Sequence, residues 1–217
     1  MVRVRCDAIL FDLDGVLIDS TPAVARVWTK WATEHGFDPK TVVRHAHGRP
    51  SIATVEAFLP QADLQAENLK LEQAEIEDLD GVVPLPGAKE LLDALPPERW
   101  TIVTSGTRPL AEVRLRAAGL QVPQRMVTAS DITNGKPDAE PYLKGAAALG
   151  LAAEDCMVIE DAPAGVRSGK TAGAAVLAVR TTLSEGELRA AGADWVVDDC
   201  RNVQVFSDSR GLLVQIT

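Results

Sequence analysis

Residues 9–17 read Ile-Leu-Phe-Asp-Leu-Asp-Gly-Val-Leu, and the interpretation of the whole chain starts from this stretch. The apolar run from Ala8 to Phe11 is typical of a buried parallel strand. Asp12 and Asp14 follow it, and two carboxylates so close together repel each other unless a positive charge lies beside them. Mg²⁺, which prefers hard oxygen ligands, would supply such a charge. Gly15 lets the backbone turn away at this point.

Beyond residue 86, short apolar runs alternate with helical segments. The expected strands cover residues 100–104, 126–128, 156–159, 174–179 and 195–197, and residues 212–216 fit an edge strand. The expected helices between them are mostly closed by glycine, which is common after a helix end. This alternation predicts an α/β core in which helices cover both faces of a parallel sheet.

Residues 18–85 have a different pattern, because helical segments follow one another with no convincing strand. A first helix is expected to begin at Ser20-Thr21-Pro22 and to end near Gly36. A long acidic helix is expected over residues 63–79, with its charge forming a solvated face. The alternative is that Glu72 and Glu75 reach the cleft from the cap. We therefore expect a core made of residues 1–17 and 86–217, and a helical insert made of residues 18–85.

Composition narrows the possible classes of protein. A net charge of −9 argues against a nucleic-acid-binding protein. No apolar run is long enough to span a bilayer, and the first residues do not resemble an export signal. Cys6, Cys156 and Cys200 are widely spaced, which fits free thiols in a reducing compartment. We expect a cytoplasmic monomer whose partner is a small molecule, with no nucleic acid and no membrane.

Polar residues directly follow several of the expected strands. In an open parallel sheet the carboxyl ends of the strands meet at one edge, where ligands bind. Four sets of polar residues are expected there: Asp12 and Asp14; Thr104, Ser105 and Gly106; Lys136; and Glu160 and Asp161. One such set would be an ordinary turn, whereas four at a single edge predict a site.

These residue types together suit phosphoryl transfer. A carboxylate nucleophile can form an aspartyl-phosphate. Lys136 and a metal held by carboxylates would neutralise the charge of the phosphoryl group. Ser105 and the free N–H groups at the start of the next helix would bind its oxygens. Asp14 can face the leaving group, protonate its oxygen and later activate water.

Four segments, taken together, resemble the signatures of the haloacid dehalogenase-like hydrolase superfamily in the family's order. They are residues 12–17, 103–107, 135–138 and 159–165. The resemblance implies a Rossmann-like core with a small all-helical cap domain inserted after the first strand. It also implies that Asp12 is the nucleophile and a Mg²⁺ ligand, and that Asp14 is the general acid/base and a backbone-carbonyl ligand.

The same resemblance assigns the remaining core residues. Ser105, with Gly106 beside it, and Lys136 would hold the phosphoryl group. Asp161 would bind Mg²⁺, and Glu160 would assist either directly or through water. For Glu160 a purely structural role is an equal alternative.

The resemblance leaves three functions to compare: a phosphatase, a mutase and a binding protein without enzymatic activity. Members that cleave carbon–halogen or phosphonate bonds lack the second aspartate, so Asp14 favours phosphate esters. Mutases of the β-phosphoglucomutase type are the alternative, but they carry a histidine in the first cap helix where this chain has Val24. A regulatory or binding protein that has the phosphatase fold but no activity is disfavoured, because no expected catalytic residue is replaced.

The cap sequence resembles a narrower group. Residues 47–51 and 81–87 are similar to sugar phosphatases that include 2-deoxyglucose-6-phosphatase and glycerol-3-phosphatase. In that group Arg49 lies in a cap loop facing the active site, where it could bind a phosphate or sugar hydroxyls. For His45 and His47 a solvated position is the simpler interpretation. We expect a Mg²⁺-dependent phosphatase of small sugar or polyol phosphate monoesters.

Overall fold

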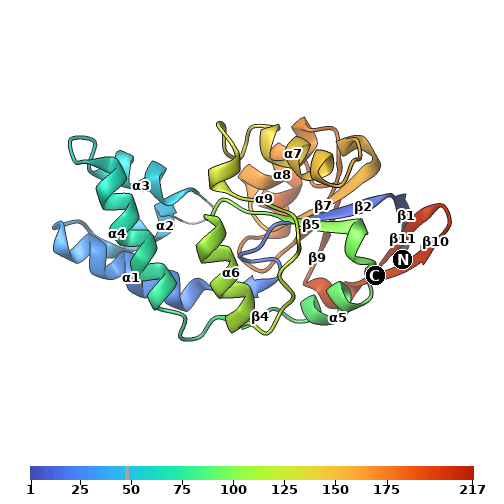
Figure 1. Ribbon diagram of the computed structural model, residues 1–217, viewed down its shortest axis with the longest axis horizontal. Coiled ribbons are helices and arrows are strands. Elements are labelled where there is room, and N and C mark those ends of the chain that lie inside the picture. Colours follow the sequence, from blue (N-terminus) through green and yellow to red (C-terminus); the bar gives the residue numbers. More distant parts are fainter. Residues whose placement is uncertain (47–48) are drawn as a thin grey trace.

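A six-stranded parallel sheet forms the centre of the computed structural model, which describes residues 1–46 and 49–217 (Figure 1). In spatial order its strands are β6 (Met126–Val127), β5 (Trp100–Val103), β2 (Ala8–Phe11), β7 (Cys156–Glu160), β8 (Ala175–Val179) and β9 (Trp195–Val197). Every neighbouring pair is parallel. The predicted α/β fold with a parallel sheet is confirmed.

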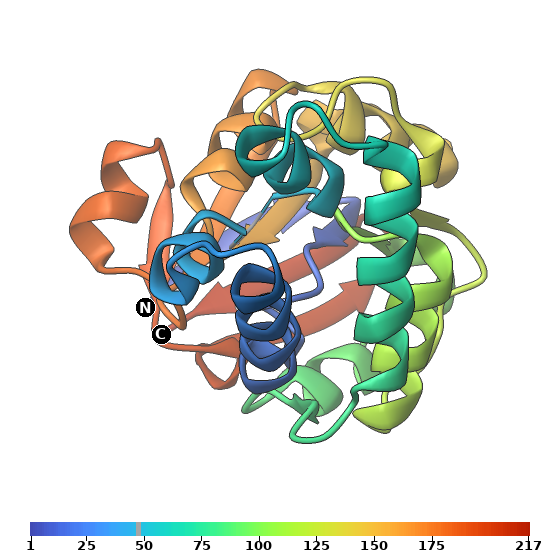
Figure 2. The same ribbon diagram turned by 90° about the vertical axis from the view of Figure 1, so that its left-hand side faces the viewer.

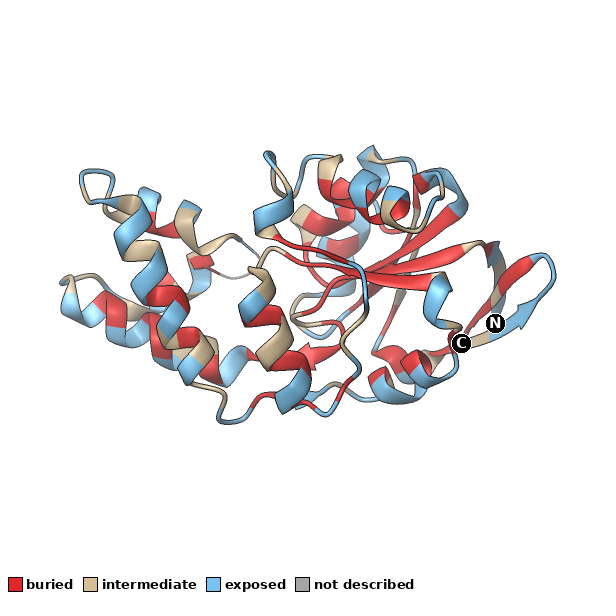
Figure 3. Ribbon diagram, in the orientation of Figure 1, coloured by how far each residue is buried: buried red, intermediate tan, exposed pale blue. Residues whose placement is uncertain are grey.

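Two apolar layers enclose this sheet. Successive residues of a strand point to opposite faces, so Ile9 and Phe11 join one core cluster while Ala8 and Leu10 join the other. Helices α5 (Ala88–Asp93) and α6 (Arg108–Ala117) supply the first layer. Helices α7 (Glu140–Ala148), α8 (Pro163–Thr171) and α9 (Glu185–Ala190) supply the second. Figure 3 shows the central strands buried along their length.

The predicted helical cap lies at one end of the molecule (Figures 1 and 2). It consists of α1 (Thr21–Glu34), α2 (Pro39–Ala46), α3 (Ser51–Phe58) and α4 (Leu64–Glu77), which pack around an apolar cluster of their own. The chain leaves the core through β3 (Ile18–Asp19) and returns through β4 (Val83–Pro84). These two segments pair as an antiparallel ribbon, so both connections to the cap run side by side.

The last apolar run differs from the sequence prediction. Residues 212–216 do form a strand, β11 (Gly211–Ile216), but it does not extend the parallel sheet. It lies between β1 (Val2–Cys6) and β10 (Val203–Asp208) in a separate antiparallel sheet. Neither β1 nor β10 was predicted, because most residues of each strand are exposed and neither strand is a continuous apolar run.

The acidic helix also differs from its prediction. Helix α4 was expected to carry its charge on a solvated face, but Glu72 and Glu75 are buried, with 9% and 6% of their surface exposed. They face α6 of the core, and the two helices are in contact. Because charge surrounds α4, sequence periodicity gave no indication of which face would be buried.

Short segments complete the chain. The 3-10 helices cover Pro97–Arg99, Ala129–Asp131, Ala153–Asp155 and Cys200–Asn202. In the part of the chain that the structure describes, we find no helix with the length and apolar character needed to cross a bilayer.

Two helical glycines provide a test of the core packing. A Cβ on Gly145 of α7 would lie 2.6 Å from Val103 of β5, whereas a Cβ on Gly186 of α9 would meet no atom within 4 Å. We expect Gly145→Ala to lower the free energy of unfolding by about 1–3 kcal/mol through overpacking. The control Gly186→Ala should raise it by about 0.5 kcal/mol, since alanine favours the helix. Chemical denaturation measures both, and equal effects would contradict this packing of α7.

Candidate active site

A cavity of about 170 Å³ lies between the carboxyl ends of the strands and the cap. Asp12 and Asp14 follow β2, Ser105 and Gly106 follow β5, and Asp161 follows Glu160 at the end of β7. The structure brings all the predicted site residues to this cavity: Asp12, Asp14, Arg49, Ser105, Gly106, Lys136, Glu160 and Asp161. His47 and Gly48, which belong to the predicted cap loop, lie outside the described residues.

Lys136 is the central cation of the site. Its Nζ lies 2.6 Å from Asp12 Oδ1 and 2.6 Å from Glu160 Oε1, and it also donates to the carbonyl oxygen of Val103 at 3.0 Å. Only 4% of the lysine side chain is exposed. Although burial opposes the charge, the Asp12 and Glu160 carboxylates raise the pKa of Lys136 above its usual value. Lys136 is therefore a fixed, buried positive charge.

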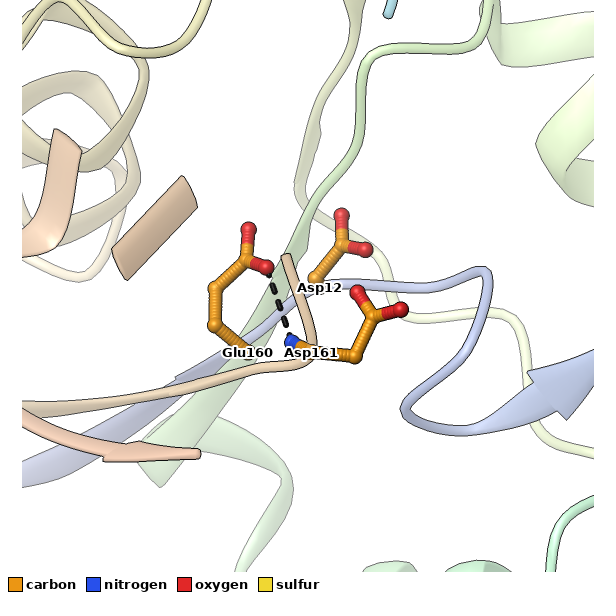
Figure 4. Close-up of side chains that lie close together, drawn as sticks. All are labelled: Asp12, Glu160 and Asp161. Atoms are coloured by element: carbon orange, nitrogen blue, oxygen red, sulfur yellow. Dashed lines mark hydrogen bonds between the residues drawn. The ribbon is translucent and has the colours of Figure 1, made fainter. Parts of the chain in front are cut away.

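Glu160 is hydrogen-bonded through both of its carboxylate oxygens. Oε1 accepts from Lys136 and from the Tyr142 hydroxyl at 2.8 Å, and Oε2 accepts from the backbone N–H groups of Asp161 and Ala162 at 2.9 and 3.1 Å (Figure 4). Gly165 makes room for this arrangement, since a Cβ there would lie 1.6 Å from Oε1. Tyr142 was not predicted, because it lies in the helix that follows residues 135–138 and outside all four motifs.

Asp161 faces the same cavity from the other side. Its Oδ2 accepts a hydrogen bond from the Thr182 hydroxyl at 2.6 Å. Gly15 passes directly beside it with φ of +85°, and a Cβ on Gly15 would lie 2.2 Å from Asp161 Oδ2. The sharp turn expected at Gly15 is confirmed, and it brings Asp14 and Asp161 to the same cavity.

The site carries more negative than positive charge. Asp12, Glu160 and Asp161 are buried and each offers a carboxylate oxygen within 4.8 Å of the others (Figure 4). Burial raises the pKa of Asp12 to about 7, with the Lys136 charge opposing the shift. Burial and then the Glu160 charge raise the pKa of Asp161 well above its usual range. Lys136 balances only one of three carboxylates, so the oxygen donors and their charge fit a hard divalent cation.

Asp14 is held from one side. The Ser20 hydroxyl donates to Asp14 Oδ1 at 2.5 Å, and Arg114 Nη1 donates to the same oxygen at 3.1 Å. Ser20, at the expected start of the first helix, makes no side-chain cap hydrogen bond. Asp19 accepts from the Thr21 backbone N–H at 2.9 Å instead. Arg114 was not predicted. Its spacing from Leu110, Ala111 and Leu115 places it on the same face of α6, which indicates a buried arginine.

The loop after β5 presents Ser105 to the cavity. The Gly106 N–H donates to the buried Thr104 hydroxyl at 3.1 Å, which matches the structural role expected for Thr104. Among the described residues, none hydrogen-bonds the Ser105 hydroxyl, so it is available to a ligand. The Thr107 hydroxyl donates to Glu72 of the cap.

The cap contributes polar groups to the opposite wall. Arg49 is exposed and lies at the cavity with Nη1 3.3 Å from His45 Nε2. Burial, with the nearby Arg49 charge, lowers the pKa of His45, so its imidazole is held towards the neutral form. Asn68 and Glu72 of α4 line the same wall. A ligand in the cavity would therefore contact both core and cap.

The Tyr142–Glu160 hydrogen bond is testable on its own. We expect Tyr142→Phe to lower the free energy of unfolding by about 1.5–3 kcal/mol, the usual contribution of a hydrogen bond to a charged group. Thr33→Ala, which removes an exposed hydroxyl bonded to the Thr29 carbonyl, serves as control and should change it by less than about 0.5 kcal/mol. Urea denaturation measures both. An unchanged midpoint in Tyr142→Phe would contradict the buried bond.

Comparison with known proteins places this geometry in a family. Hexitol phosphatase A of Escherichia coli is 42% identical to the chain over 212 residues, covering 95% of the chain and 97% of that protein. The 2-deoxyglucose-6-phosphate phosphatase 1 of Saccharomyces cerevisiae is 34% identical, covering 100% and 97%. The crystal structure of a hydrolase from Pseudomonas syringae superposes with a TM-score of 0.80 at 29% identity, covering 90% and 94%. Residues 6–173 match the haloacid dehalogenase-like hydrolase model, and the chain belongs to that family.

Proposed function

We propose that this protein is a Mg²⁺-dependent phosphatase that hydrolyses small sugar or polyol phosphate monoesters through an aspartyl-phosphate on Asp12. The observation that carries the proposal is the buried Asp12 carboxylate, fixed by Lys136 at 2.6 Å beside Asp161 and facing the cavity. The names of the two curated relatives, a hexitol phosphatase and a 2-deoxyglucose-6-phosphate phosphatase, support the substrate class.

The first half of the reaction transfers the phosphoryl group. An Asp12 oxygen attacks phosphorus, the bond from phosphorus to the ester oxygen breaks, and Asp14 gives its proton to the departing alcohol. Lys136 neutralises charge on Asp12 and on the phosphoryl oxygens, and the Ser105 hydroxyl donates to one of these oxygens. Because Gly106 N–H is bonded to Thr104, we assign Gly106 the role of shaping this loop more than of donating.

The second half releases phosphate. Asp14, now a carboxylate, takes a proton from water while the water oxygen attacks phosphorus and the bond to Asp12 breaks. This restores the Asp12 carboxylate and the protonated Asp14, so one water is consumed for each ester. Lys136 again neutralises the charge that develops on Asp12.

The metal-binding residues follow from the donor set. Asp12 and Asp161 would supply carboxylate oxygens and Asp14 its backbone carbonyl, and the bound Mg²⁺ would neutralise phosphoryl charge. Both oxygens of Glu160 already accept two hydrogen bonds each. We therefore assign Glu160 to holding Lys136 and the Asp161 loop, with any contribution to the metal passing through water.

The division of the chain belongs to the same proposal. Residues 1–17 and 86–217 would form the catalytic core, and residues 18–85 the cap that determines the substrate. The separate apolar cluster of α1–α4 and the paired connections β3 and β4 support this division. We also place the protein in the cytoplasm, because its three cysteines are buried free thiols. That it is a monomer is part of the same proposal.

Phosphate release tests the function directly. The panel would contain D-glucitol 6-phosphate, glycerol phosphates, 2-deoxyglucose 6-phosphate, β-glucose 1-phosphate and nucleoside monophosphates, with Mg²⁺ or with EDTA. We expect release from sugar or polyol phosphates that EDTA abolishes and Mg²⁺ restores. Asp12→Asn should reduce kcat by at least about 10³-fold, as for loss of a nucleophile. Asp198→Asn, which changes an exposed aspartate paired with Arg180, is the control and should match the wild type.

Other outcomes would contradict the proposal. Conversion of β-glucose 1-phosphate to its isomer without phosphate release would indicate the mutase alternative, which the position of Val24 at the cavity disfavours. Metal binding without turnover of any ester would indicate a binding protein. Full activity in Asp12→Asn would exclude the aspartyl-phosphate mechanism.

A further inference from the structure

Arg114 lies inside the protein between the candidate acid and the cap. It projects from α6 of the core and is only 4% exposed. Its Nη1 donates to Asp14 Oδ1 at 3.1 Å, and its Nη2 lies 3.6 Å from Glu75 Oε2 of α4. Figure 2 shows α4 and α6 lying against each other, and the two helices are in contact. One guanidinium thus contacts carboxylates from the core and from the cap.

A buried guanidinium needs partners for its five N–H donors. Within residues 1–46 and 49–217, no acceptor hydrogen-bonds Arg114 Nε or Nη2. Burying a guanidinium with unpaired N–H donors lowers the stability of the fold. Such a residue is therefore a candidate for a functional role. Glu75, 6% exposed, lies 3.6 Å from Nη2 and balances the charge of Arg114 from the cap side.

The contacts at Asp14 are asymmetric. Ser20 and Arg114 both donate to Oδ1, and no described residue donates to Oδ2. An oxygen that already accepts two hydrogen bonds is a poor site for a donated proton, so an Asp14 that acts as an acid would donate from Oδ2. The two hydrogen bonds also fix the rotation of the carboxyl group of Asp14, which lines the cavity. Orientation of this kind determines how well a proton donor reaches a leaving group.

We infer that Arg114 is a positioning residue, which orients the Asp14 carboxyl group for proton transfer and is itself held by Glu75 of the cap. The inference rests on the proposed acid/base role of Asp14. The acid is then held by a chain of contacts that crosses from core to cap. A second contact of α4 with the core, Glu72 to Thr107, connects α4 to the loop that presents Ser105. Helix α4 thereby supports both the proton donor and the phosphoryl-binding loop.

Two substrates with different leaving groups separate positioning from general structural support. D-glucitol 6-phosphate releases an alkoxide, which needs a proton from Asp14, whereas p-nitrophenyl phosphate releases a stable phenolate, which does not. The quantity to compare is kcat/KM, because it reports steps up to transfer of the phosphoryl group to Asp12. The ratio of the two kcat/KM values in one preparation does not depend on how much of the protein is folded.

We expect Arg114→Gln to reduce kcat/KM for D-glucitol 6-phosphate about 10- to 100-fold more than for p-nitrophenyl phosphate, within the usual contribution of general acid catalysis. Glu75→Gln should change the ratio in the same direction by a smaller factor. Arg114→Lys should recover part of the loss, since it restores the charge without the planar fork. The control Arg116→Gln, at an exposed arginine paired with Glu112, should leave the ratio unchanged.

Equal losses for both substrates, or no loss in Arg114→Gln, would overturn the inference. Asp14→Asn measured beside it separates this failure from failure of the proposed function. If Asp14→Asn reduces glucitol phosphate turnover selectively and Arg114→Gln does not, only the role of Arg114 is wrong. If Asp14→Asn leaves that turnover intact, the proposed acid is wrong and the inference falls with it.

Discussion

The buried contact of Lys136 with Asp12 and Glu160 is the constraint on which the site depends. Three carboxylates at the ends of two adjacent strands would repel one another, and one buried ammonium at 2.6 Å from two of them offsets part of this repulsion. Tyr142 and the loop amides complete the hydrogen bonds of Glu160, and Gly165 gives it space. The negative charge that remains fits a divalent cation.

The cap adds a second set of constraints to this centre. Helix α4 contacts α6 through Glu75 and Glu72, which meet Arg114 and Thr107. These contacts bury carboxylates that would otherwise be solvated, so the cap is more than a cover over the cavity. They connect the region that would select the substrate with the residues that would handle its proton and its phosphoryl group.

The sequence allowed most of the core to be predicted, since parallel strands read as apolar runs and their polar carboxyl ends meet at one edge. It did not predict β1, whose partner β11 lies at the other end of the chain, or β10, which pairs with the adjacent β11. Nor did it decide whether Glu72 and Glu75 are solvated or lie at the cleft, because a helix charged all round does not reveal its packed face. Tyr142 and Arg114 lie outside the motifs, and only tertiary packing brings them to Glu160 and Asp14.

The central claim is that Asp12 becomes phosphorylated during turnover, and chemical trapping tests it most directly. Borohydride reduces an acyl phosphate on aspartate to homoserine, which peptide mass spectrometry locates. Protein quenched during turnover of D-glucitol 6-phosphate with Mg²⁺ should carry homoserine at position 12 and at no other aspartate. Substrate-dependent homoserine at another position, or none during active turnover, would contradict the account.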